Sequence, residues 1–151
     1  MRPLAFIPVL LFIALGAEAA DIAFVGNWSE TIGASDLVGG AGTDIYSQIT
    51  SSTSKATLDI TDTGGVTWII GVSRSSSNLP AGVAVAVRRT TSGSGGGSIS
   101  GGSFIAVRAT EQILCSGTGD RSGVGLQLRL TGLSVEQDTG SFGATLTYRI
   151  Y

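Results

Sequence analysis

Hydrophobic and polar side chains alternate in two stretches near the C-terminal end of the chain. In residues 124–131 the apolar positions are Val124, Leu126, Leu128 and Leu130. In residues 144–150 they are Ala144, Leu146, Tyr148 and Ile150. A spacing of two residues is that of a β-strand with one face buried and the other exposed. The pattern therefore predicts two strands that share a core.

Shorter stretches of the same kind occur earlier in the chain, separated by polar or glycine-rich segments. They are residues 21–28, 44–50, 56–61, 66–74, 83–87, 104–107 and 111–115. In the segment 66–74, one face would carry Val66, Trp68, Ile70 and Val72, and we expect these side chains to form the densest part of the core. Asp62-Thr63-Gly64-Gly65 is a turn signal before that strand. About eight to ten strands are expected, arranged as an all-β, antiparallel β-sandwich.

The composition favours strands and narrows the range of functions. Only 13% of the 151 residues are charged and 23 are glycine. With a net charge of −2, the chain offers no basic face for nucleic acid. It contains no histidine, which argues against serine–histidine hydrolases and most zinc sites. Cys115 is the single cysteine, so an intrachain disulfide is impossible and the thiol is expected to be buried. We expect neither a cofactor nor a bound metal.

The first nineteen residues have the pattern of a signal peptide. Met1-Arg2 is basic, residues 4–15 are almost wholly apolar, and Ala17-Glu18-Ala19 has the small-x-small form of a cleavage site. The apolar run is too short to span a bilayer as a helix. We therefore expect residues 1–19 to be removed and residues 20–151 to form one secreted domain without a membrane span. Such a protein would pass through the periplasm and act outside the cell or on its surface.

Two glycine-rich connections stand out within the predicted domain. The strand at 21–28 is followed by Ser29–Gly42, so residues 20–42 are interpreted as an N-terminal arm. Thr90–Gly102 has the composition of a flexible linker and is expected to be a surface loop within the domain. Arg88-Arg89, just before it, would end a strand with charge.

Three sets of residues are candidate sites of chemistry. Asp59 and Asp62 offer oxygens for calcium, although aspartates that cap turns are the more common explanation. Paired carboxylates for glycoside hydrolysis would come from Asp44, Asp59, Glu111, Glu136 and Asp138, whose spacing does not single out a pair. An exposed aromatic platform for sugar would use Trp28, Tyr46 and Tyr151, but aromatic residues on alternating strands belong more often to a core.

The chain resembles bacterial pilin-like subunits, including fimbrial and spore-coat-U-like proteins. The resemblance lies in the segment from Gly140 to Tyr151, together with the signal peptide and the glycine- and threonine-rich body. The resemblance implies an immunoglobulin-like sandwich whose subunits polymerise when the N-terminal arm of one completes a sheet of the next. By position, the donor residues would be Ile22, Phe24 and Trp28. The acceptor groove would include Leu146, Tyr148 and Ile150.

The expected function is that of a non-enzymatic, exported structural subunit of a surface filament, pilus or coat, built as a homopolymer by strand addition. The alternative is a monomeric secreted module that binds carbohydrate or another surface ligand through loops such as 90–102. A histidine-free hydrolase with two carboxylates is a third possibility. The pattern leaves open whether the strand at 21–28 pairs within its own domain or with a neighbouring subunit.

Overall fold

The computed structural model describes residues 20–137 and 140–151. The predicted signal peptide, residues 1–19, and the candidate carboxylate Asp138 lie outside the described residues.

The larger of two sheets is built around β10 (Arg121–Thr131), the first of the two strands identified by their alternation. Its main order is β1 (Asp21–Val25), β3 (Ala56–Thr61), β10, β5 (Ala84–Arg89) and β8 (Ile105–Ala106). Two short strands, β2 (Gln48–Thr50) and β6 (Ser94–Gly95), also pair with β10. β10 can hold four partners because, at eleven residues, it is long enough to pair with different strands along its length.

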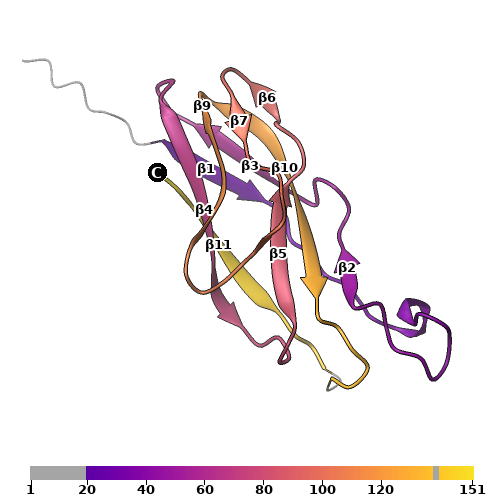
Figure 1. Cartoon of the computed structure of the whole chain (residues 1–151). Coiled ribbons are helices and arrows are strands. Elements are labelled where there is room, and N and C mark those ends of the chain that lie inside the picture. Colours follow the sequence, from indigo (N-terminus) through magenta and orange to yellow (C-terminus); the bar gives the residue numbers. More distant parts are fainter. Residues whose placement is uncertain (1–19, 138–139) are drawn as a thin grey trace, which may run out of the picture.

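The smaller sheet has the order β11 (Ala144–Ile150), β4 (Thr67–Ser77), β9 (Gln112–Thr118) and β7 (Ile99–Ser100). Every strand pairing in the two sheets of the described chain is antiparallel. The one helical element in these residues is the 3-10 turn η1 (Ala34–Asp36). The predicted all-β fold with two antiparallel sheets is confirmed (Figure 1). The finer expectation of an immunoglobulin-like arrangement stays a prediction.

The core lies between the sheets and is formed by the apolar side chains that point inward from the strands. Its largest fully buried side chains are Trp68, Leu58, Ile60, Ile70, Leu126, Val72, Val87 and Val124. The Trp68 ring is 1% exposed, and its Nε1 donates a hydrogen bond of 2.8 Å to the carbonyl oxygen of Gly119. A Cβ at Gly117 would lie 2.6 Å from this ring. The glycine therefore makes room for the tryptophan, which fills the interior in the absence of a disulfide.

Expected strand boundaries are wrong at several places, and the strand expected at 21–28 ends at Val25. Val66 is 64% exposed, because the turn before β4 includes it: its N–H donates to the carbonyl of Thr63 at 3.1 Å. The strand expected at 44–50 is reduced to β2, and Ile45 forms only an isolated bridge with Leu37. At Val66 a hydrogen bond within a turn overrides the alternation of apolar residues. Residues 44–46 instead form backbone hydrogen bonds to residues 36–38, outside both sheets.

The connection Thr90–Gly102 is on the surface, as expected, but it is held by both sheets. It contains β6, which pairs with β10, and β7, which pairs with β9. Arg89 fixes its end by donating from Nε to the carbonyl of Gly101 at 2.7 Å. The glycines in this segment serve close backbone approach: a Cβ at Gly97 would lie 2.2 Å from the carbonyl oxygen of Thr118.

Candidate functional site

The predicted donor segment forms β1, an edge strand of the larger sheet that pairs within its own chain. It runs antiparallel to β3 in register from Asp21 opposite Thr61 to Val25 opposite Thr57. Ile22 lies opposite Ile60 and packs against the core. β1 stands last in the order of its sheet, so its other side offers backbone N–H and C=O groups to a further strand.

A donor residue and an acceptor residue predicted from the sequence contact each other directly. The rings of Phe24 and Tyr148 are stacked, with centroids 4.9 Å apart and an interplanar angle of 18°. Phe24 comes from β1 and Tyr148 from β11, which is the edge strand of the smaller sheet. The stack therefore joins the edges of the two sheets on the same side of the molecule, where β1 and β11 run close together (Figure 1).

The other predicted acceptor residues line the same inner surface. Leu146 and Ile150 are half-buried and pack against the core, as Tyr148 does. The hydroxyl of Tyr148 is buried and has no hydrogen-bond partner in the described part of the chain, and burial raises its pKa above the ordinary value. A phenol that keeps its proton in an apolar setting serves here as a packing surface for Phe24.

Trp28, the third predicted donor, does not take part in this contact. It follows the end of β1, and its Nε1 donates to Oε2 of Glu30 at 3.1 Å. The predicted donor set thus separates into two residues on a strand, Ile22 and Phe24, and one in the connection that follows.

The connection from β1 to β2, residues 26–47, extends beyond the ends of the two sheets (Figure 1). Most of its side chains are exposed. It is held mainly by its own hydrogen bonds, such as those from Val38 N to Asp44 O at 2.8 Å and from Tyr46 N to Asp36 O at 2.9 Å. At its start, Gly26 has a φ of +133°, and a Cβ there would lie 2.7 Å from Cα of Ala56. The long arm expected at 20–42 is thus a strand followed by a loop that is folded mainly on itself.

The candidate carboxylates are engaged in separate hydrogen-bond networks. Asp44 accepts from Val135 N at 2.9 Å, and Asp59 accepts from Gly123 N at 2.7 Å. Glu111 accepts from the hydroxyl of Tyr151 at 2.5 Å. Glu136 lies in the connection after β10, where its N–H donates to Ser134 Oγ at 3.2 Å.

These hydrogen bonds lower the pKa of both Asp44 and Asp59. Backbone donors, first Val135 for Asp44 and first Gly123 for Asp59, hold the pKa of each carboxyl below its usual value. Asp62 lies in the turn after β3 with a φ of +57°. Within residues 20–137 and 140–151, no three side chains of the types that bind metals gather at one place. The geometry thus assigns Asp44 and Asp59 to anchoring loops and turns.

The aromatic residues proposed as a sugar platform lie apart. Tyr151 continues the pairing of β11 with β4, exchanging backbone hydrogen bonds of 3.0 Å with Ile69. Tyr46 is 53% exposed and belongs to the connection before β2, which lies at the far end of the molecule from the C-terminus (Figure 1). These two rings do not form a common surface.

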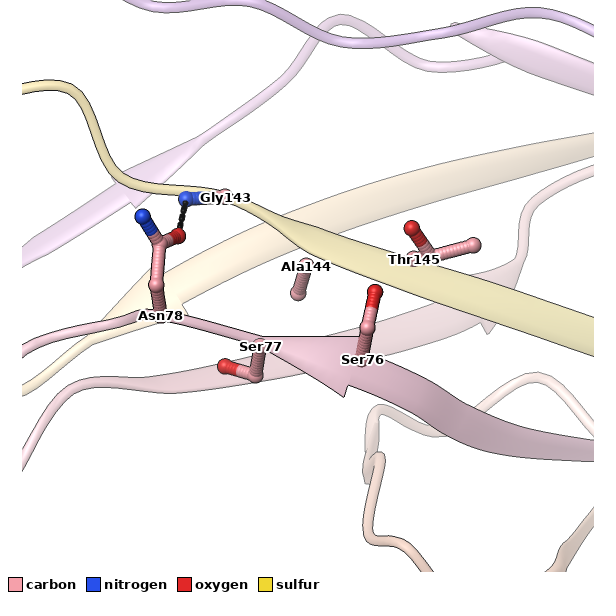
Figure 2. Close-up of a pocket in the computed structure, with 6 residues that line it drawn as sticks. All are labelled: Ser76, Ser77, Asn78, Gly143, Ala144 and Thr145. Carbon is pink, nitrogen blue, oxygen red and sulfur yellow. Dashed lines mark hydrogen bonds between the residues drawn. The ribbon is translucent and has the colours of Figure 1, made fainter.

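Two shallow hollows occur on the described surface. The first, of about 470 Å³, lies where β4 ends and β11 begins, and its lining is Ser76, Ser77, Asn78, Gly143, Ala144 and Thr145 (Figure 2). Asn78 closes it by accepting a hydrogen bond of 2.6 Å from Gly143 N. The second, of about 280 Å³, lies between residues 100–105 and 113–116. The first is lined by small neutral side chains without an aromatic ring, and such a lining is poor in the convergent groups that define a ligand site.

One cluster was missed by the sequence reasoning. Arg88, Arg129 and Phe104 come together on the outer face of the larger sheet, with both guanidinium groups over the same ring. Arg88 and Arg129 each lie at a polar position of an alternating strand, and this is the only local feature of the sequence that indicates the cluster. The pairing of β5 with β10 decides that the two side chains are neighbours, and the sequence pattern does not specify that pairing.

No helix in the described part of the chain combines the length and apolar character needed to cross a membrane. No known protein family, curated protein or solved structure matches this chain.

Proposed function

We propose that the chain is an exported, non-enzymatic structural subunit of a surface filament, pilus or coat, in which β1 of one subunit pairs with β3 of the next. The observation that carries the proposal is the stack of Phe24 on Tyr148. It connects an edge strand at the start of the chain to a strand at its end. The same stack forms when β1 belongs to a neighbouring copy, so exchange preserves the contact.

The position of β1 favours exchange. In the described chain it pairs with β3 alone, and its residues 23–25 are exposed. The connection after it spans residues 26–47 and reaches up to about 70 Å when extended, which is enough to cross to a neighbouring domain. Exchange of an identical element is a low-cost route to assembly because the contacts in the closed and exchanged forms are the same.

Open-ended assembly follows from the direction of the exchange. Each subunit gives β1 to one neighbour and receives β1 from another, so the contact is heterologous and forms chains unless the rotation between subunits closes a ring. The resemblance of Gly140–Tyr151 to pilin-like subunits supports the same mode of assembly.

The test compares chains that begin at Ala20, examined by light scattering after size exclusion and by negative-stain microscopy over a range of concentrations. The unaltered chain is expected to form ordered polymers as concentration rises. Phe24→Ala should abolish them, whereas Val25→Ala, at a position 65% exposed on the same strand, should leave them intact. A chain lacking residues 20–32 should stay unassembled and bind a peptide of residues 20–32 in trans. Polymers that persist in both the Phe24→Ala and the deleted chain would refute the proposal.

A second candidate is a monomeric secreted module that binds carbohydrate or another surface ligand. The observation that favours it is the pairing of β1 with β3 inside one chain, which completes the sheet without a neighbour. This candidate predicts a monomer at all concentrations and retention by a glycan array. A monomer that binds none of a broad set of glycans would count against this candidate.

A further inference from the structure

The outer face of the larger sheet carries two arginines side by side. In the pairing of β5 with β10, Arg88 lies opposite Gln127, and Arg129 lies opposite Ala86. The two arginines are therefore diagonal neighbours on adjacent strands, at a separation that long side chains bridge easily. Their side chains point away from the core, because the alternate residues Val87 and Leu126 are buried in it.

Phe104, just before β8, brings the two charges together. Cζ of Arg129 lies 3.5 Å from the centroid of the Phe104 ring, and Cζ of Arg88 lies 4.7 Å from it. The two guanidinium carbons are thus at most about 8 Å apart, a distance over which physiological salt screens only part of their repulsion. Each cation–π contact offsets some of this repulsion, and the ring holds both groups in place.

The hydrogen bonds of these guanidinium groups are incomplete. Nε of Arg88 donates to Oε1 of Gln127 at 2.9 Å, and Gln127 is itself fixed by its donation to the carbonyl of Ser51 at 2.6 Å. Nε of Arg129 is buried and has no hydrogen-bond partner among the described residues. In the described ranges, neither group forms a hydrogen bond to a carboxylate. A buried donor of this kind normally has an acceptor, so its lack of one calls for an explanation.

The surface beside the two guanidinium groups leaves room for an anion. Ala84 and Ala86 on β5 are half-buried, and Ala106 on β8, opposite Ala86, is exposed. These short side chains form a low floor beside the two longer cations. Arginine offers its N–H donors in a planar fork that matches the oxygens of carboxylate, sulfate and phosphate groups.

We propose that Arg88, Arg129 and Phe104 form an oxyanion-binding site on the outer face of the β5–β10 pair, which takes a carboxylate, sulfate or phosphate group. The anion accepts hydrogen bonds from both guanidinium groups and neutralises their mutual repulsion, while Phe104 holds them in position. This site does not depend on the exchange of β1, which occurs at the opposite edge of the same sheet.

The test follows the Nε–Hε signals of the arginines by NMR in the chain that begins at Ala20, during titration with sodium sulfate, sodium phosphate and sodium glucuronate at constant ionic strength. Sodium chloride provides the baseline. The signals of Arg88 and Arg129 are expected to shift saturably and together with at least one of the three anions, while that of Arg74, in the other sheet, stays unchanged. Arg88→Gln and Arg129→Gln should each weaken the affinity about ten- to a hundredfold, as expected for the loss of a charged hydrogen bond.

Arg74→Gln is the matched control, since it removes the same charge and should leave the affinity unaltered. Phe104→Leu tests the supporting role of the ring: it keeps both cations and should weaken binding while the affinity remains measurable. The titration is repeated with a sulfated or uronate-containing oligosaccharide. If the site takes an anionic group carried by a glycan, the oligosaccharide binds more tightly than the free anion. If the site takes the free anion, the two bind equally well. Shifts that do not saturate, or an affinity equal in Arg129→Gln and Arg74→Gln, would overturn the proposal.

Discussion

The stack of Phe24 on Tyr148 should be measurable as a coupling free energy between the two ends of the chain. In a double-mutant cycle, Phe24→Leu and Tyr148→Leu are made singly and together. Leucine keeps an apolar side chain at each position while it removes the ring. With centroids 4.9 Å apart and planes 18° from parallel, the pair should contribute about 0.5–1.5 kcal/mol beyond its buried area.

The single substitutions should have moderate costs. Phe24 is 42% exposed, so its change to leucine is expected to cost about 1 kcal/mol, in the middle of the usual range for point substitutions. Urea unfolding followed by circular dichroism gives the free energy of unfolding of each variant. The measurement is made at a concentration low enough for a monomer, so that the stack within one chain is the quantity observed.

The matched control is a cycle of Phe24→Leu with Phe142→Leu. Phe142 is 44% exposed, almost the same as Phe24, and lies in the connection before β11. Because this pair is not stacked, its effects should add to within about 0.3–0.5 kcal/mol. If the Phe24–Tyr148 cycle is equally additive, the contact between β1 and β11 is not energetically significant, and the reasoning behind strand exchange loses its basis.

Three further predictions concern the core and the turns. Trp68→Phe should lower the free energy of unfolding by about 2–4 kcal/mol, because it leaves a cavity and removes a buried hydrogen bond. The control Trp28→Phe removes a hydrogen bond at the surface and should lower it by less than about 0.5 kcal/mol. Equal losses in urea unfolding would contradict the burial described. Tyr148→Phe removes a buried hydroxyl without a partner, so the unfolding free energy should stay equal or rise, and a clear loss would reveal a partner for that hydroxyl. Hydrogen bonds from the side chain of Thr63, and secondly from its backbone N–H, lower the pKa of Asp120. The stabilisation by Asp120 is therefore complete above the pKa of the unfolded chain, about 3.9, and is lost as the pH falls through the lower pKa of the folded state. Asp120→Asn should flatten the decrease in melting temperature at acidic pH, and an unchanged slope would contradict the assignment.

The strand pattern of the chain is a local property and is readable from the sequence. The alternation in residues 124–131 and 144–150 corresponds to β10 and β11, and Trp68, Ile70 and Val72 are buried as expected. A strand places successive side chains on opposite faces whatever its partner is, so the period of two alone identifies which residues face a core. Val66 departs from this rule because a turn hydrogen bond fixes it outside β4.

Partners and registers were decided by the tertiary structure. Phe24 and Tyr148, which the sequence predicts as a donor and an acceptor residue, are more than a hundred positions apart, and only the placement of β1 and β11 at neighbouring sheet edges brings their rings together. Likewise, the pairing of β5 with β10 makes neighbours of Arg88 and Arg129, whose guanidinium groups both lie over the Phe104 ring. The physical reason is that alternation defines the face of a residue but not its cross-strand neighbour. That neighbour depends on which strand pairs with which, and therefore on how the whole core packs.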